Sequence, residues 1–337
     1  MSYSQRLLLA LLYAICVDGK PLQPTRDRDT MLQTEAAHVS TQAASTSVTT
    51  ASLSNGVKIP MLGFGTWNLS PNDAKTEVNR TLKLAHPPSI DTSPDYKNQD
   101  AVREGIGKEH RCMYFLTTKV NPMADFTPEN AYSKTMEQHE ENLKELGKEH
   151  VDLVLLHYPV SVVLPSLSSD DQCAIHREMW RATETFYNEK KAKAIGVSNW
   201  CPSTFDCIKG SATVTPQVNQ VKLHAGMGSD PGGIHSEMKA RGVLLQAYSA
   251  LGSPDGVDSV LKSEALKRIG KAHGTTAASV AIRWLVQHEV AVVTTSTNTT
   301  HMQQALDSFT YELSAAEMSE IDGLQLGQDT YSFGCTS

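Results

Sequence analysis

The sequence contains no hydrophobic run long enough to cross a bilayer and no excess of positive charge. Its longest apolar run, Leu7 to Val17, has 11 residues, whereas a membrane-spanning helix needs about 20. With 30 Lys and Arg against 37 Asp and Glu, the net charge is −7, which disfavours nucleic acid or an anionic membrane as the main partner. The sequence thus predicts no nucleic-acid partner and no membrane attachment of the mature chain.

The sequence also lacks any closely spaced cysteine motif. Its six cysteines are Cys16, Cys112, Cys173, Cys201, Cys207 and Cys335. No two of them have the CxxC spacing that is typical of zinc and redox sites, so no metal site is predicted. Cysteines scattered in this way favour a set of reduced structural thiols over a disulfide framework.

The first 52 residues are not expected to belong to the fold. Arg6 precedes the apolar run, whose length is typical of the h-region of a signal peptide, and cleavage after Gly19 would remove residues 1–19. Residues 20–52 are rich in Thr, Ser, Ala and Gln, a composition typical of a disordered linker. The alternative to a secretory leader is an N-terminal disordered extension on a cytoplasmic protein.

Strand and helix patterns alternate through residues 53–326. Asn55-Gly56 predicts a type I′ β-hairpin. The segments after it that have the composition of buried strands are residues 63–67, 89–91, 114–119, 151–157, 194–197, 218–221, 243–248 and 290–293. Eight parallel strands alternating with helices close into a (β/α)8 TIM barrel. We therefore predict one α/β barrel over residues 53–326, with the hairpin closing its bottom, and a short C-terminal tail over residues 327–337.

Polar side chains stand where several of these strands end. Asp91, Lys119 and His157 close three predicted strands, and Tyr96 follows in the loop after Asp91. The carboxyl ends of barrel strands share one rim, so these four side chains are expected to converge. Taken alone, a histidine such as His157 is more often a core residue bonded to a backbone carbonyl than a catalytic group.

Together the four residue types have a chemical use. A tyrosine has a pKa near 10, and a lysine within about 4–6 Å is expected to lower it so that the phenol can donate a proton near neutral pH. The aspartate would hold the lysine, and the histidine would orient a carbonyl oxygen. A proton donor of this kind needs a hydride donor beside it, which no side chain provides.

The chain resembles an aldo-keto reductase over nearly all of residues 53–324. The motifs that carry the resemblance are Gly63-Phe64-Gly65-Thr66-Trp67, Ile90-Asp91-Thr92 with Tyr96, Thr118-Lys119, Asp152 to Pro159, Ile195-Gly196-Val197-Ser198-Asn199, Val218-Asn219-Gln220 and Gln246 to Gly252. Their order and approximate spacing both fit that family. The resemblance implies NADPH-dependent reduction of a small-molecule ketone or aldehyde to an alcohol, by a monomer.

The resemblance also implies a role for each matched position. Tyr96 would be the general acid, Lys119 and Asp91 the pair that tunes it, and His157 the residue that orients the carbonyl. The residues implied to bind the cofactor are Ser198, Asn199, Gln220, Tyr248, Ser249, Leu251, Ser253, Ser296 and Asn298. Trp67, Tyr158 and His157 would line the substrate pocket. Singly, many of these positions would fit a turn or a core aromatic equally well.

One departure from the family concerns the loop after the last strand. The family usually has a lysine and, six residues later, an arginine that bind the 2′-phosphate of NADP, whereas this chain has Thr295 and His301. An unperturbed histidine is mostly uncharged near neutral pH, so two charges are lost. We predict a weakened preference for NADPH, with NADH accepted as well. Asn298 is also a formal glycosylation site, which argues partly against secretion.

The remaining departures bear on the substrate. The tail after Leu324 is short, and aromatic content is only 6%, so the pocket is expected to be open and to admit a medium or bulky metabolite. A non-catalytic binding protein on the same barrel is the alternative function, since a fold does not fix an activity. A dehydrogenase that works in the oxidative direction is a further alternative, and sequence does not decide between the directions.

Overall fold

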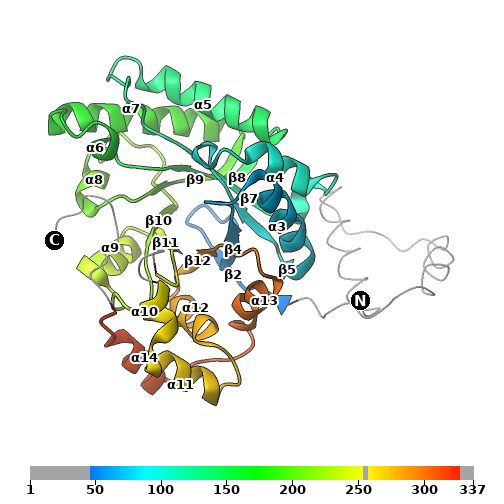
Figure 1. Ribbon diagram of the computed structural model, residues 1–337. Coiled ribbons are helices and arrows are strands. Elements are labelled where there is room, and N and C mark those ends of the chain that lie inside the picture. The colour runs from blue at the N-terminus through cyan, green and yellow to red at the C-terminus, as the bar shows by residue number, and fades with distance from the viewer. Residues whose placement is uncertain (1–45, 253–256, 327–337) are drawn as a thin grey trace, which may run out of the picture.

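The computed structural model describes residues 46–252 and 257–326. Within these ranges eight parallel strands form a closed barrel with neighbours in the order β10-β11-β12-β4-β6-β7-β8-β9, and helices surround it (Figure 1). The barrel strands are β4 (Leu62–Gly65), β6 (Ser89–Asp91), β7 (Phe115–Val120), β8 (Val151–Leu156), β9 (Ala192–Ser198), β10 (Val218–Lys222), β11 (Leu244–Tyr248) and β12 (Ala291–Thr294). The predicted TIM barrel is confirmed.

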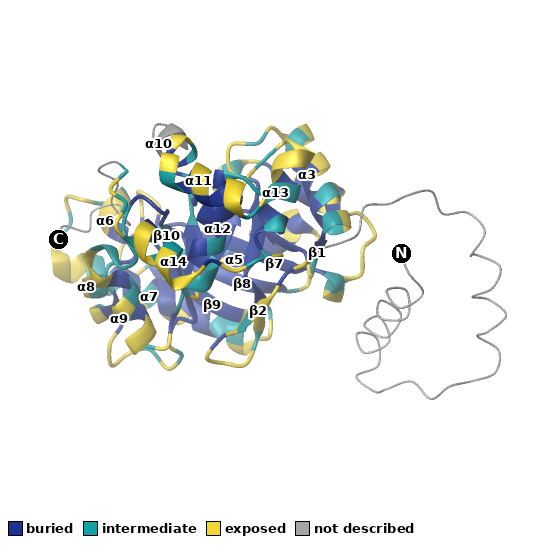
Figure 2. Cartoon of the chain, turned by 90° about the horizontal axis from the view of Figure 1, so that it is seen from below, coloured by how far each residue is buried: buried dark blue, intermediate teal, exposed yellow. Residues whose placement is uncertain are grey.

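The helices lie in the connections between the barrel strands and after the last of these strands. They are α3 (Pro71–Leu84), α4 (Gln99–Ile106), α5 (Ala131–Leu146), α6 (Val160–Val163), α7 (Ser169–Asn188), α8 (Pro202–Asp206), α9 (Ile234–Ala240), α10 (Val257–Lys262), α11 (Glu264–Ala272), α12 (Ala277–Gln287), α13 (Thr299–Asp307) and α14 (Ala315–Asp322). Figure 2 shows dark blue on the barrel strands and yellow on the outer helices and loops. None of the helices that the structure describes has the length and apolarity that a bilayer crossing requires.

Strand β8 shows why these segments form a barrel. All six of its residues are buried, as expected for a parallel strand covered on both faces. Its single polar residue, Asp152, is satisfied by the Arg111 side chain, by Lys193 at 2.9 Å and by the backbone N–H of Leu116 at 2.7 Å. The strand therefore contributes apolar burial without leaving a charge unpaired.

The N-terminal hairpin packs against the bottom of the barrel. Strand β2 (Thr50–Ser52) pairs antiparallel with β3 (Lys58–Pro60). Leu53 and Ile59 of this hairpin join a buried cluster with Phe115 at the start of β7 and Val218 at the start of β10. The hairpin thus closes the bottom, as predicted.

Two details of this region differ from the predictions. The turn is not type I′, because only Gly56 (φ 87°) and not Asn55 has a positive φ; a type I turn followed by glycine fits the hydrogen bonds from the N–H groups of Leu53 and Gly56. The prediction of a disordered linker up to residue 52 is wrong for the last part of that segment. Thr46–Ser47 (β1) pairs with Ala85–His86 (β5), and β2 belongs to the hairpin. In this segment, backbone hydrogen bonds to neighbouring strands order residues whose polar composition predicted disorder. Residues 1–45 and 327–337, with the predicted leader and tail, lie outside the described residues.

The interpretation of the cysteines as reduced thiols is wrong. A disulfide joins Cys173 of α7 to Cys207 at the end of α8, with their Cα atoms 4.8 Å apart, within the range that a disulfide requires. Cys112 and Cys201 are also disulfide-bonded, and none of the described cysteines is free. Cys173 and Cys207 have a sequence separation of 34, and they meet because the barrel brings the ends of α7 and α8 together.

Replacing both Cys173 and Cys207 by serine is expected to lower the free energy of unfolding by about 2–4 kcal/mol. The disulfide closes a loop with a sequence separation of 34, so its loss enlarges the conformational freedom of the unfolded chain. Thermal or urea unfolding without reductant would measure the difference. An unchanged transition, together with two free thiols at these positions in wild-type peptide maps, would refute the assignment.

Candidate active site

Four polar side chains meet at the carboxyl ends of three neighbouring strands, as predicted. Asp91 ends β6, Lys119 lies near the end of β7, His157 follows β8, and Tyr96 closes the short 3-10 helix η1 (Pro94–Tyr96) after β6. The Lys119 ammonium donates to the Tyr96 hydroxyl at 3.1 Å. The rings of Tyr96 and His157 stand nearly perpendicular, with centroids 5.8 Å apart. The tyrosine hydroxyl and the imidazole are thus brought into one site.

A buried ion pair lies beneath this site. Lys119 is fully buried and Asp91 is 4% exposed, and the Lys119 ammonium donates to one carboxylate oxygen of Asp91. The other oxygen accepts from the side-chain amide of Gln220, on β10, at 2.8 Å. Asp91 therefore binds the Lys119 ammonium from the neighbouring strand and the Gln220 amide from the opposite side of the barrel.

The expectation that Lys119 lowers the pKa of Tyr96 is wrong for this structure. Burial and then the negative charge of Asp91 raise the pKa of Tyr96 well above its usual value. Asp91 balances the charge of Lys119, so that charge does not outweigh the effect of burial on Tyr96. Tyr96 is held in its protonated form, which is the form that a proton donor requires.

His157 is neutral and is contacted by side chains that the sequence reasoning missed. Burial, followed by the charge of Lys119, lowers the pKa of His157 well below its usual value. Its Nδ1 atom lies 2.8 Å from the Asn121 side-chain oxygen and 3.2 Å from the Ser93 hydroxyl. The Asn121 amide group in turn donates to Asp95 at 2.8 Å. The sequence did contain a pattern that points to Asn121. This residue follows Lys119 by two positions, so in an extended strand its side chain faces the same way as that of Lys119.

These contacts determine which nitrogen of His157 carries the proton. With the oxygen of Asn121 facing Nδ1, the ring proton lies on Nδ1 and Nε2 is an acceptor. If the Asn121 amide is turned over, its NH2 group faces Nδ1 and the proton moves to Nε2, where it can be donated to a carbonyl oxygen. The orientation of this one amide therefore controls the role predicted for His157.

The residues predicted to hold the nicotinamide end of a cofactor also meet. The Ser198 hydroxyl accepts from the Asn199 amide at 3.1 Å, and Tyr248 donates to Asn199 at 2.8 Å. Gln220 lies next to them, because its backbone oxygen accepts from the Ser198 hydroxyl at 2.8 Å and from the Asn199 N–H at 2.9 Å. Asn199 (φ 62°) and Ser249 (φ 50°), at the ends of β9 and β11, hold left-handed backbone, which non-glycine residues adopt mainly where surrounding structure or function requires it.

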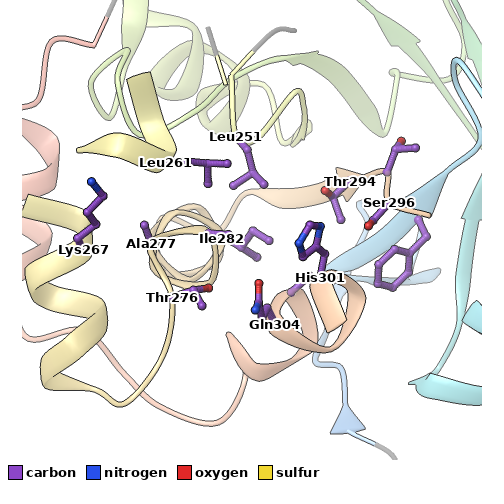
Figure 3. A pocket seen from close by; sticks show the side chains of 14 residues that line it. Leu251, Leu261, Lys267, Thr276, Ala277, Ile282, Thr294, Ser296, His301 and Gln304 are labelled. Carbon is purple, nitrogen blue, oxygen red and sulfur yellow. The ribbon is translucent and has the colours of Figure 1, made fainter. Parts of the chain in front are cut away.

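A cavity of about 300 Å³ lies between α12, α13 and the end of β12. Leu251, Thr295, Ser296 and His301 line it, and Figure 3 shows the side chains of His301 and Gln304 between the two helices. Asn298 is not among the lining residues; its side chain caps α13 by accepting from the Thr300 N–H at 2.8 Å. The predicted Ser253 lies outside the described residues.

The two predicted substrate residues stand at the mouth of the barrel. Trp67 follows β4 and is 51% exposed. Tyr158 stacks on His157, with ring centroids 4.0 Å apart. The mouth therefore offers aromatic surface next to the polar centre.

The sequence is similar to characterised oxidoreductases. The sequence pattern of the aldo/keto reductase family matches residues 61–325. Morphine 6-dehydrogenase from Pseudomonas putida is 30% identical over 286 residues, which are 82% of this chain and 90% of that protein. Glyoxal reductase from Bacillus subtilis is 31% identical over 278 residues, which are 82% of this chain and 92% of that protein.

Solved structures agree with these sequence relatives. MGS-M4, an aldo-keto reductase from a deep-sea metagenome library, superposes with a TM-score of 0.73 at 29% identity, over 85% of this chain and 99% of that one. A variant of Gox0644 in complex with NADPH superposes with a TM-score of 0.72 at 27% identity, over 86% and 97%. With the family pattern spanning the whole barrel, the chain belongs to the aldo/keto reductase family and is an oxidoreductase that acts on carbonyl or alcohol groups with a nicotinamide cofactor.

Proposed function

We propose that the protein reduces a ketone or aldehyde on a medium or bulky metabolite, with Tyr96 as the proton donor. The observation that carries this proposal is the buried chain of contacts from Asp91 through Lys119 to the Tyr96 hydroxyl. A nicotinamide cofactor supplies the hydride when it is bound. The protein's own contribution is to position the carbonyl and to deliver a proton to its oxygen.

Each polar residue has a defined part in this proton delivery. Tyr96 remains protonated until charge develops on the carbonyl oxygen, because burial disfavours its phenolate. Lys119, 3.1 Å from the phenol oxygen, then stabilises the phenolate that the transfer leaves behind. His157 is neutral and its ring stands beside that of Tyr96, so that it orients the carbonyl oxygen next to the proton donor.

The described residues fit a bound nicotinamide cofactor. Ser198, Asn199 and Gln220 bring hydroxyl and amide groups together beside the ion pair, which suits a carboxamide. The cavity beside α13 (Thr299–Asp307) provides room for the adenosine end, and the N-terminus of that helix favours an anionic group. Tyr248 donates to Asn199, and Leu251, three residues later in the chain, lines the cavity.

Tyr96→Phe is expected to lower kcat by about 10²–10⁴-fold while cofactor affinity stays close to that of the wild type. The substitution removes only the hydroxyl that donates the proton. Steady-state kinetics and a fluorescence titration with NADPH would measure the two effects. Thr185→Ser is the control. It changes a hydroxyl-bearing side chain on the outer helix α7, far from the site, and shows whether preparing a variant by itself alters kcat or cofactor affinity.

Unchanged turnover in Tyr96→Phe would exclude this mechanism. Turnover lost together with cofactor binding would instead mean that the substitution disturbs the fold.

We also propose that the adenosine pocket discriminates weakly between NADPH and NADH. Thr295 and His301 line the cavity where the resemblance predicts a lysine and an arginine. Arg80 of α3 does approach this loop, donating to the backbone oxygen of Thr297 at 3.1 Å, but Glu77 pairs with it. Lys267 also lines the cavity, but it pairs with Glu264 at 3.0 Å. At the loop of Thr295 and His301 itself, hydroxyl groups and the helix terminus are left to hold a phosphate, and neither carries a full charge.

The double substitution Thr295→Lys with His301→Arg is expected to tighten NADPH binding by about tenfold or more, with NADH little changed. Hydrogen bonds to charged groups contribute on the order of 1.5–3 kcal/mol each, and only NADPH carries the 2′-phosphate. Parallel fluorescence titrations with both cofactors measure this. If NADPH and NADH bind equally more tightly to the variant, the proposed role of this loop is wrong. If the wild type binds neither NADPH nor NADH, the result supports the non-catalytic alternative.

We propose that the chain enters the secretory pathway. Disulfide bonds persist in oxidising compartments, and Cys112, Cys173, Cys201 and Cys207 are all disulfide-bonded. The apolar run Leu7 to Val17 is consistent with a leader.

Expression of the full chain in a eukaryotic secretory host is expected to yield protein in the medium that begins at Lys20. N-terminal sequencing and thiol titration of that protein would measure both features. Intracellular protein that retains Met1 and carries free thiols would refute this localisation.

A further inference from the structure

Asp95 places a carboxylate at the mouth of the active site. It lies immediately before Tyr96, and one of its oxygens is 3.6 Å from Nδ1 of His157. Its side chain is 47% exposed, whereas the neighbouring His157, Ser93 and Asn121 are buried. The charge is therefore both close to the reacting groups and open to solvent on the side from which a substrate enters.

This charge has no cationic partner in the part of the chain that the structure describes. The Asn121 amide donates to one oxygen of Asp95 at 2.8 Å, and no lysine or arginine nitrogen lies within 4.0 Å of either oxygen. Lys119 and Lys97 act on it only at longer range, and Lys119 is already paired with Asp91. A cation that binds in the mouth would supply the missing partner.

Apolar side chains are also exposed after strands that lie close to β6 in the barrel. Among the described residues the exposed large hydrophobic side chains are Trp67 (51%), Met123 (49%) and Val162 (40%). They follow β4, β7 and β8 respectively; β4 and β7 flank β6, which leads to Asp95, and β8 is the next strand beyond β7. All three therefore stand on the rim through which a substrate passes, where exposed apolar surface indicates a binding site.

We propose that the substrate is a carbonyl compound that carries a protonated amine on an apolar body, with the amine beside Asp95 and the body against Trp67, Met123 and Val162. This inference rests on the proposed carbonyl reduction and specifies its substrate class. Asp95 is a specificity-determining residue here. It discriminates between substrates by charge, because opposite charges favour binding and like charges disfavour it.

The test uses three benzaldehydes that differ almost only in charge. The substituents are dimethylaminomethyl (cationic), 2-methylpropyl (neutral) and carboxymethyl (anionic), each at the 3- and the 4-position of the ring. The kcat/KM of each is measured with NADPH at a pH of about 8, well above the usual aspartate pKa. Reduction of the neutral compound establishes carbonyl reduction independently of the charge preference.

Asp95→Asn is expected to lower the ratio of cationic to neutral kcat/KM by about fivefold and to raise the anionic to neutral ratio, in at least one of the two positional series. Asp95 also orients Asn121, so the substitution changes turnover of every substrate. The ratios cancel that common effect, and comparing each ratio between the wild type and the variant cancels the electronic effect of the substituents. Added salt should reduce the wild-type preference and leave the variant's ratios almost constant.

Asp100→Asn is the matched control. It removes one negative charge from the exposed first turn of α4, five residues along the chain, and should leave both ratios at their wild-type values. Ratios that are the same in wild type and Asp95→Asn for both positional series, with the neutral aldehyde still reduced, would overturn the proposed substrate class alone. Failure of the wild type to reduce any of the compounds, although it binds NADPH, would overturn the proposed function as well.

Discussion

The ion pair between Lys119 and Asp91 is the interaction on which the site depends. Both groups are buried, and an unpaired charge at such a place is strongly unfavourable, so removing one partner of a buried pair typically costs roughly 3–5 kcal/mol. Each partner therefore holds the other in one position. Through that pair the end of β6 is tied to β7, and through Gln220 it is tied to β10 across the barrel.

Everything polar in the mouth is arranged around this pair. Lys119 positions the Tyr96 hydroxyl and, with burial, keeps His157 neutral. Because Asp91 already balances the lysine, the phenol of Tyr96 stays protonated in the folded protein. The same compensation leaves Asp95 without a lysine or arginine partner among the residues that the structure describes, although the Asn121 amide donates to it.

The sequence predicted the barrel and the four central residues because both leave local signals. Buried parallel strands are short apolar runs, and the residue that ends such a run lies on the shared rim. That is why Asp91, Lys119 and His157 could be selected from their positions alone. The disulfide between Cys173 and Cys207 left no such signal, because it joins two helices whose proximity depends on barrel closure.

What the sequence by itself determined was therefore the order of elements, the strand-end residues and the loss of two charges at Thr295 and His301. Tertiary structure decided the rest. It set the protonation preference of Tyr96, because desolvation depends on every neighbour that packs around the phenol. It brought Asn121 and Asp95 to His157, because hydrogen bonds between successive barrel loops follow from closure of the barrel and have no periodicity along the chain.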